Sequence, residues 1–240
     1  MGLPWPIVRW VGSRTYRSSQ REEQARRTRR RVLDAATAVF LERGFAGSTM
    51  RLIAHRSGVS LPTVELLFGT KGRLLKAAID VAIAGDDEPV AVLQRSWTEA
   101  AARAETVPRF LTVLAGVLGP AQQRSAGLVL AVFEAASTDG ELADLAGRMT
   151  AQRVTTAEWI VDEVKRRALL RAGSTRSEAI DTVWILMDPA IFDRLTRQRG
   201  WTLRRYQHWF ASSVARLVTA DAAPSASSTK DATTTRRHVT

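Results

Sequence analysis

The chain has 240 residues, of which 45% are hydrophobic and 25% are charged, and its net charge at pH 7 is +11. This length suffices for one large domain or two modest ones with proper cores. The sequence contains no cysteine, which excludes disulfides, thiolate metal sites and a thiol nucleophile and fits a cytoplasmic protein. No apolar run approaches the ~18 residues that a membrane span needs, so we expect no contact with a membrane.

The excess positive charge is concentrated in the first third of the sequence. Residues 1–80 contain fifteen Lys and Arg against six Asp and Glu, whereas residues 81–220 contain seventeen against sixteen. A basic segment joined to a nearly neutral body is typical of a protein that binds the phosphate backbone of a nucleic acid.

Two segments precede the first strongly periodic stretch. Residues 1–20 have no helical period and contain two prolines and two glycines, so we expect a disordered extension or a start codon assigned too far upstream. Residues 21–31 are rich in arginine. Such a run is often only the solvated beginning of a helix. Before a DNA-binding motif it favours contact with phosphates or an adjacent minor groove, with Arg29 and Arg30 as candidates.

A first helix is predicted from about residue 31. Its apolar stripe recurs at helical spacing and consists of Val32, Leu33, Ala36, Val39 and Phe40. Gly44 is expected to end this helix, because glycine readily adopts the left-handed backbone that closes one.

Residues 48–71 predict two further short helices joined by a tight turn. Thr49 can cap the first and Ser60 the second, since a side-chain oxygen accepts from the free N–H groups of a first helical turn. Gly58 supplies the turn, and Pro62 falls where its missing N–H costs nothing. This is the pattern of a helix-turn-helix, whose second helix is built to lie in the DNA major groove. An ordinary corner between two helices of a bundle is the alternative interpretation.

The segment from about Arg31 to Ala82 resembles the tetracycline-repressor (TetR) family of bacterial regulators. The matching positions are Ala35, Ala36, Phe40, Arg43-Gly44-Phe45, Ser48-Thr49, Ile53-Ala54, Gly58-Val59-Ser60, Thr63, Phe68, Lys71 and Leu74-Leu75. The resemblance implies an all-α protein, in which a helix-turn-helix DNA-binding domain (residues 21–76) precedes a larger helical ligand-binding and dimerisation domain (residues 77–220). It also implies that Lys71, at the start of the next helix, contacts a DNA phosphate.

The exposed side of the predicted recognition helix departs from the family pattern. Leu61 and Pro62 stand where many members have Lys-Gly, Glu65 where a phosphate-binding Tyr is usual, and Leu67 where a second aromatic is usual. Leu61 and Leu66 can contact thymine methyl groups and Glu65 can accept from a cytosine amino group, but no Arg, Lys, Asn or Gln is available for bidentate base reading. We therefore expect phosphate-dominated binding with modest base readout. The predicted DNA surface comprises Arg29, Arg30, Thr49, Arg51, Arg56, Ser60, Leu61, Thr63, Glu65, Leu66 and Lys71.

From residue 81 onward the pattern is helical, with no strand-like alternation and no internal repeat. A loop at residues 85–89 contains three acidic residues, which we expect to be solvated rather than to bind a metal. Residues 221–240, rich in Ala, Ser and Thr, are expected to be a disordered tail. Helices are predicted over residues 90–105, 106–118, 121–136, 141–170, 176–187, 190–198 and 202–219, with a break at Gly119-Pro120.

The last predicted helix is apolar on more than one side and therefore needs two neighbours. Trp209 and Val218 point off its main apolar face, which consists of Leu203, Tyr206, Phe210, Val214 and Leu217. In the TetR family the last two helices pair with their copies, so the resemblance implies a homodimer through residues 175–187 and 202–219. The two recognition helices would then lie about 34–36 Å apart, one DNA turn. A last helix that is central to its own core is the alternative.

Aromatic side chains are scattered through the interior helices. At helical spacing they are typical of plain core, whereas the resemblance implies a pocket for a small-molecule effector among residues 90–190. Few ionisable groups interrupt the apolar faces, so a mainly apolar effector is expected. The candidates for the pocket wall are Trp97, Phe110, Phe133, Trp159 and Trp184.

No motif for catalysis is present. The histidines, His55, His208 and His238, are far apart in the sequence, and no zinc-protease, phosphate-loop, dinucleotide or nucleophile-elbow pattern occurs. We expect no enzyme activity, no catalytic residue, no metal and no cofactor. The sequence thus predicts a dimeric repressor that leaves its operator when an effector binds. Two alternatives stay open: a non-sensing DNA-binding protein without a pocket, and a small-molecule-binding protein whose helix-turn-helix has lost specific DNA binding.

Overall fold

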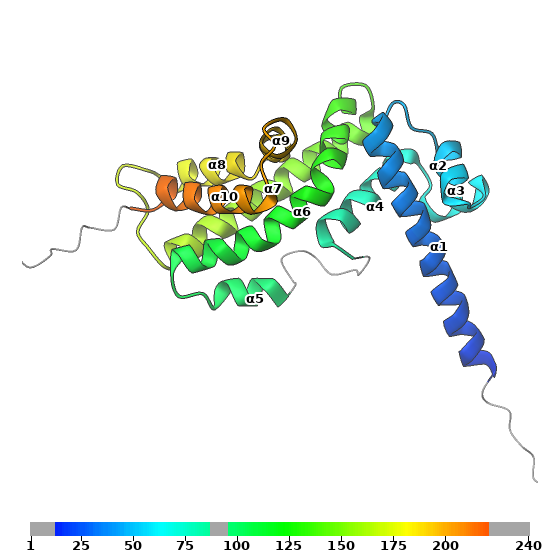
Figure 1. The fold of residues 1–240 in the computed structure, drawn as a ribbon, viewed down its shortest axis with the longest axis horizontal. Coiled ribbons are helices and arrows are strands. Elements are labelled where there is room, and N and C mark those ends of the chain that lie inside the picture. The colour runs from blue at the N-terminus through cyan, green and yellow to red at the C-terminus, as the bar shows by residue number, and fades with distance from the viewer. Residues whose placement is uncertain (1–12, 87–95, 221–240) are drawn as a thin grey trace, which may run out of the picture.

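The computed structural model describes residues 13–86 and 96–220, and within these ranges the protein is helical, without a β-strand (Figure 1). The all-α fold predicted from the sequence is confirmed. No helix of the described ranges is long and apolar enough to cross a bilayer. The elements are α1 (Ser13–Arg43), α2 (Met50–Ser57), α3 (Leu61–Phe68), α4 (Lys71–Ala84), α5 (Ser96–Ala102), α6 (Val107–Ala135), α7 (Gly140–Lys165), α8 (Arg176–Leu186), α9 (Pro189–Asp193), the π-helical segment η2 (Arg194–Gln198) and α10 (Leu203–Val218).

The first four helices form the N-terminal domain, and their boundaries follow from local chemistry. Thr49 Oγ1 accepts from the Leu52 N–H at 3.1 Å and so caps α2. Ser60 Oγ caps α3 by accepting from the Thr63 N–H at 3.4 Å. Gly58 ends α2 with a φ of 63°, a left-handed backbone that a residue with a Cβ adopts only at a cost. The predicted helix-turn-helix is therefore confirmed as a structure.

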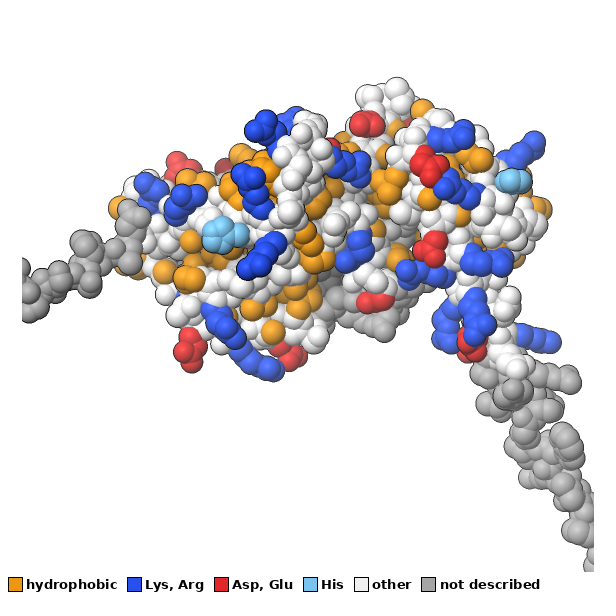
Figure 2. All heavy atoms as spheres, in the orientation of Figure 1, with side chains coloured by type: hydrophobic (Ala, Val, Ile, Leu, Met, Phe, Trp, Pro, Cys, Tyr) orange, Lys and Arg blue, Asp and Glu red, His pale blue; other side chains and the backbone are white. Residues whose placement is uncertain are grey.

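Helix α1 begins at Ser13, so the prediction of a disordered segment up to residue 20 was wrong for its last part. No Pro or Gly interrupts the sequence from Ser13 to Arg43, and pairs one turn apart, such as Glu23 with Arg27, support a solvated helix. The N-terminal part of α1 projects beyond α2 and α3, and Figure 2 shows Lys and Arg side chains gathered along it. Residues 1–12 lie outside the described residues, as do residues 221–240.

Helix α6 runs unbroken through Gly119-Pro120, where the sequence predicts a break. A proline inside a helix costs roughly 3 kcal/mol, so packing must offset it. That packing comes from α10, which crosses α6 so closely that a Cβ on Gly119 would lie 2.8 Å from Gln207 Cγ and 3.1 Å from Leu203 Cδ1. Helix α5 ends at Ala102, short of the predicted end at 105, and residues 87–95 lie outside the described residues.

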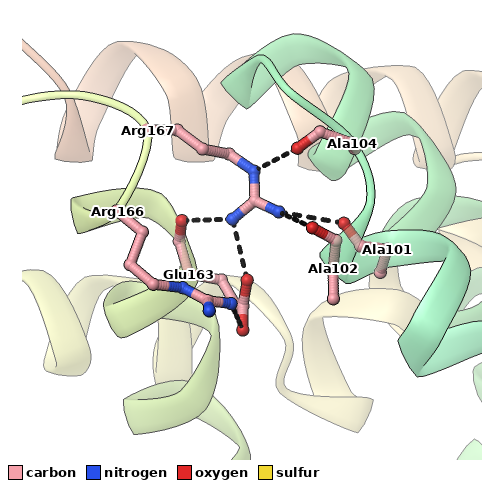
Figure 3. Close-up of polar contacts among 6 residues, drawn as sticks. All are labelled: Ala101, Ala102, Ala104, Glu163, Arg166 and Arg167. Carbon is pink, nitrogen blue, oxygen red and sulfur yellow. Dashed lines mark hydrogen bonds and ion pairs between the residues drawn. The ribbon is translucent and has the colours of Figure 1, made fainter.

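Helix α7 ends at Lys165, about five residues before its predicted end. Arg167 leaves the helix because its guanidinium donates to the carbonyl oxygens of Ala101, Ala102 and Ala104 at 3.0, 2.9 and 2.7 Å and to the Glu163 carboxylate at 2.7 Å (Figure 3). Glu163 also pairs with Arg166. The chain then runs beside the end of α10, where the Arg171 N–H donates to the Val218 carbonyl at 3.0 Å.

The C-terminal domain is built around α6, α7 and α10. The buried face of α10 consists of Tyr206, Phe210, Val214 and Val218. Leu217, predicted for this face, is instead about half exposed, because the face repeats every four residues and passes through Val218. The helix predicted over residues 190–198 is present as α9 and the π-helical η2.

The two domains share α4, and the predicted boundary between residues 76 and 77 falls inside it. Residues from α6 and α7 complete the core of the N-terminal domain: Leu128, Val129, Val132, Leu142, Leu145 and Ala146. At the start of α4 the Thr70 hydroxyl donates to the Glu141 carboxylate of α7, with distances of 3.0 and 2.9 Å to its two oxygens. At its end Arg124 of α6 donates to the carbonyls of Ala82 and Ile83 at 2.7 and 3.2 Å. Helix α4 is thus held at both ends by the C-terminal domain.

Candidate DNA-binding surface and effector cavity

Helix α3 presents an apolar and acidic face to solvent. Val64 and Phe68 are buried against the other helices, whereas Pro62, Glu65 and Leu66 are exposed. Leu66 is 86% exposed, so it is the most exposed of the large apolar side chains in the described ranges. Of the residues predicted for this face, Leu61 and Thr63 are only partly exposed, and Leu61 packs against the core of the N-terminal domain.

The start of α3 is held by a pair of hydroxyl groups. Ser60 Oγ and Thr63 Oγ1 lie 2.7 Å apart and share a hydrogen bond. Arg29 of α1 lies over the Phe68 ring at 4.8 Å, so the basic end of α1 packs directly on the end of α3. These contacts fix α3 relative to α1.

Two of the predicted phosphate-binding cations have other partners in the structure. Arg56 forms a two-pronged pair with Glu42 of α1 at 2.5 and 2.7 Å, and the same hydrogen bonds lower the pKa of Glu42 and raise that of Arg56. Lys71 Nζ donates to the carbonyls of Phe45 and Ser48 at 2.8 and 3.0 Å and lies 3.9 Å from the Phe45 ring centre. Burial lowers the pKa of Lys71. Lys71 therefore ties the loop between α1 and α2 to α4, a role that its sequence position did not predict.

The other predicted cations lie on the surface. Arg51 of α2 is exposed and makes no hydrogen bond or ion pair to any residue of the described ranges. Arg30 pairs with Asp34 one turn along α1 at 3.0 Å. Such an exposed pair is weak and exchanges readily with other charged groups.

A cavity of about 220 Å³ lies in the C-terminal domain, beside the end of α4. Trp97 and Phe133 line it, as predicted. The other wall residues are Ile83, Ala84, Leu114, Val117, Leu118, Ala121, Gln122, Arg124, Ser125, Val129, Met149, Gln152, Arg153, Thr156, Ile160, Met187 and Pro189.

Three of the predicted wall residues lie elsewhere. Trp159 packs edge-on against Trp97 and Phe110, with ring centres 5.7 and 5.8 Å apart, so Trp159 and Phe110 support the wall from behind. Trp184 lies under the guanidinium of Arg153 at 4.4 Å. Periodicity marks an apolar helix face but not which of its residues border a void, so these placements could not be read from the sequence.

The cavity wall also contains polar groups that the sequence did not single out. Arg153 pairs with Asp188 at 2.9 Å, and the Gln122 amide donates to the Met187 carbonyl at 2.6 Å. No group of three His, Asp or Glu side chains suited to a metal ion occurs in residues 13–86 or 96–220.

The structure thus joins a basic helix-turn-helix domain, through α4, to a helical domain that contains a cavity. Residues 32–78 match the family model described as bacterial regulatory proteins, tetR family. The resemblance seen in the sequence is thus confirmed over the helix-turn-helix domain, which is similar to the DNA-binding domain of this family. A comparison with curated proteins gives no match.

Solved structures show the same fold at low sequence identity. A TetR-family transcriptional regulator from Rhodococcus sp. is 17% identical, with a TM-score of 0.57 over 80% of this chain and 99% of that chain. A transcriptional regulator from Saccharomonospora viridis in complex with choline is 16% identical, with a TM-score of 0.58 over 80% and 97%. FadR from Bacillus subtilis in complex with stearoyl-CoA is 17% identical, with a TM-score of 0.60 over 78% and 96%.

Proposed function

We propose that the protein is a homodimeric repressor that binds operator DNA through α2 and α3 and releases it when a small molecule enters the cavity. The proposal rests on one observation, which is that α4 contacts both functional regions. Its first residue, Lys71, is bonded to the loop that precedes α2, and its last residues, Ile83 and Ala84, line the cavity. A ligand that shifts the end of α4 would therefore shift the helix-turn-helix. This role needs no catalytic step, and it places the protein in the cytoplasm, where bacterial DNA lies.

In this proposal α3 enters the major groove. Leu61 and Leu66 contact thymine methyl groups and Glu65 accepts from a cytosine amino group. Arg51 and the arginines of α1, including Arg29 and Arg30, neutralise phosphates. Thr49 lies at the start of α2, and Ser60 and Thr63 lie at the start of α3. In this proposal the free N–H groups of these first turns donate to phosphates of the DNA backbone. Arg56 and Lys71, which the sequence assigns to phosphates, act mainly through the protein contacts described above.

Dimerisation is proposed through α8 and α10. Ile185 on α8 and Leu217 on α10 are each about half exposed. Figure 2 shows further hydrophobic side chains at the surface over this half of the molecule. Large apolar side chains that are exposed at a surface favour burial against a second copy. A twofold dimer would present two copies of α3 to successive major grooves.

The proposal is tested by fluorescence anisotropy on DNA that flanks the protein's own gene, titrated from low to physiological salt. A specific regulator binds this DNA with steep salt dependence and with a clear margin over scrambled DNA of the same length. Salt-dependent binding of equal affinity to both DNAs would show that the protein binds DNA only non-specifically. Absence of binding at every salt concentration would overturn the assignment of α3 as a recognition helix.

The proposed contact between Leu66 of α3 and DNA can be tested against a control leucine of similar exposure elsewhere in the chain. Leu66 is 86% exposed on α3, and Leu169 is 82% exposed in the C-terminal domain. Leu66→Ala should weaken operator binding by about 1 kcal/mol, roughly fivefold, and reduce the margin over scrambled DNA. Leu169→Ala should leave both quantities unchanged. Equal behaviour of the two variants would show that Leu66 does not contact DNA.

A further inference from the structure

The polar groups of the cavity are unevenly divided between donors and acceptors. Arg124 and Arg153 line it, and no Asp or Glu is among the described wall residues. The hydroxyls of Ser125 and Thr156 each donate to a carbonyl of their own helix, at 2.8 and 3.0 Å, and therefore offer only lone pairs to the cavity. These neutral acceptors do not offset the charge of the two guanidinium groups. Two cations and no acid among the described wall residues give this part of the cavity a positive potential.

Arg153 is the more buried of the two cations. Its side chain is 13% exposed, and one Nη–H donates to Asp188 Oδ2 at 2.9 Å. The other oxygen of Asp188 accepts from the Ala190 N–H at 2.8 Å and caps α9, so this carboxylate is shared. The Nε–H of Arg153 is buried and has no hydrogen-bond acceptor among the described residues. An unpaired buried donor on a charged group is costly, and an acceptor brought close to it would be bound strongly.

Two further wall residues add to the excess of donors. Trp97 Nε1–H is also buried without an acceptor in the described part of the chain. Arg124 uses Nε and one Nη for the carbonyls at the end of α4, which neutralises none of its charge. Three side chains of the cavity wall, from α5, α6 and α7, thus carry N–H donors.

The rest of the wall sets the shape of the molecule that would fit. It is mainly apolar, with Leu114, Leu118, Met149 and Ile160 among its residues. A cavity of about 220 Å³ suits a small molecule with one ring or a short chain. The molecule must therefore be small, largely apolar and rich in acceptors at one end.

Building on the proposed function, we propose that the effector is a small carboxylate with an apolar body, and that its carboxylate binds beside Arg153. The apolar body packs between Trp97 and the aliphatic wall. This refines the prediction of a mainly apolar effector by adding a single anionic end. Because the net charge of Arg153, Asp188 and Arg124 is +1, one carboxylate leaves the occupied cavity neutral.

The first test compares an acid with its uncharged isostere. 4-Phenylbutanoate and 4-phenylbutanamide are titrated into the full-length protein, and binding is followed by tryptophan fluorescence and by the shift of the melting temperature. The carboxylate should bind at least tenfold more tightly than the amide, which is about 1.4 kcal/mol. Equal affinities, tighter binding of the amide, or no binding of either probe would overturn the proposal.

The second test locates the charge that recognises the carboxylate. In the double variant Arg153→Gln/Asp188→Asn the ion pair is removed without a change in net charge, and Asn can still cap α9. The preference for the acid should fall below about threefold, because only the more distant charge of Arg124 remains. Arg148→Gln, which removes an exposed arginine from the same helix, should keep the full preference. A double variant that keeps it as well would exclude Arg153.

A variant that retains the positive charge distinguishes loss of the carboxylate site from collapse of the cavity. Arg153→Lys should preserve a preference for the acid even if the double variant binds neither probe, and loss of the preference in Arg153→Lys would overturn the proposal. Operator binding is measured separately on each variant without ligand. Specific operator binding combined with no preference for the acid would refute the carboxylate site alone. A clear preference with no operator binding would refute the proposed function and leave the site standing.

Discussion

Each domain contains an arginine–glutamate pair, and the two pairs differ in burial. In the C-terminal domain Arg167 and Glu163 are 6% and 8% exposed. In the N-terminal domain Arg56 and Glu42 are 42% and 51% exposed. Charges removed from water must stay paired, whereas an exposed pair exchanges with solvent ions at little cost. The buried pair therefore fixes the architecture, while the exposed pair of Arg56 and Glu42 can be broken at little cost in stability.

The largest expected effect comes from breaking the buried pair. Arg167→Met removes the donors to three carbonyls and leaves Glu163 with Arg166 alone, so unfolding in urea should show a loss of about 3 kcal/mol. Arg166→Met, which removes the exposed partner of the same carboxylate, serves as the control and should cost much less. Equal losses would show that burial does not distinguish the two arginines.

A smaller effect is expected in acid. Burial acts to raise the pKa of Glu163, but hydrogen bonds from Arg166 and Arg167 outweigh it, and the pKa lies below its usual 4.5. A carboxylate of this kind contributes its full stability above pH 4.5 and loses it as the pH falls through the lower folded-state value. Glu163→Gln should therefore flatten the fall of melting temperature below pH 4.5. Glu42→Gln should leave that fall almost unchanged, because its carboxylate is exposed.

The smallest change in stability and a change in DNA binding are expected from the exposed pair. Glu42→Gln removes the carboxylate partner of Arg56. Because an exposed ion pair contributes little to stability, the melting temperature should not change measurably. The slope of log affinity against log salt concentration should become steeper by about one unit, since one more cation can meet a phosphate. Glu99→Gln makes the same charge change at the exposed pair with Arg103 in the C-terminal domain and should not alter the slope. A steeper slope in both variants would indicate only a general effect of net charge.

The parts of the fold that local chemistry controls were predictable from the sequence. Thr49, Gly58 and Ser60 act within one helical turn of their own positions, so their residue types suffice to place the ends of α2 and α3. The exposure of Leu66 followed in the same way, because one face of a short helix was already taken by Val64 and Phe68. The ends of α2 and α3 and the exposure of Leu66 could therefore be predicted from local sequence, whereas the protein partners of Arg56 and Lys71 could not.

Contacts between residues far apart in the sequence explain what could not be predicted. Pro120 stays within α6 because α10 packs against Gly119. Arg167 ends α7 because its acceptors belong to α5 and the following loop. Lys71 faces the Phe45 and Ser48 carbonyls more than twenty residues earlier. In each case a tertiary contact overrides the local pattern. The cavity wall was only partly predicted for the same reason, because its residues come from α4, α5, α6, α7 and α9.

The continuity of α6 gives the protein a single rigid rod between its two functional ends. Its 29 residues span about 44 Å, from the crossing with α10 to the residues Leu128, Val129 and Val132 in the core of the DNA-binding domain. A tilt of about 5° at one end of such a rod would displace the other by roughly 4 Å. Had the helix broken at Gly119-Pro120, a joint there would absorb that motion, and the two subunits of a dimer could not alter the spacing of their recognition helices by tilting against each other.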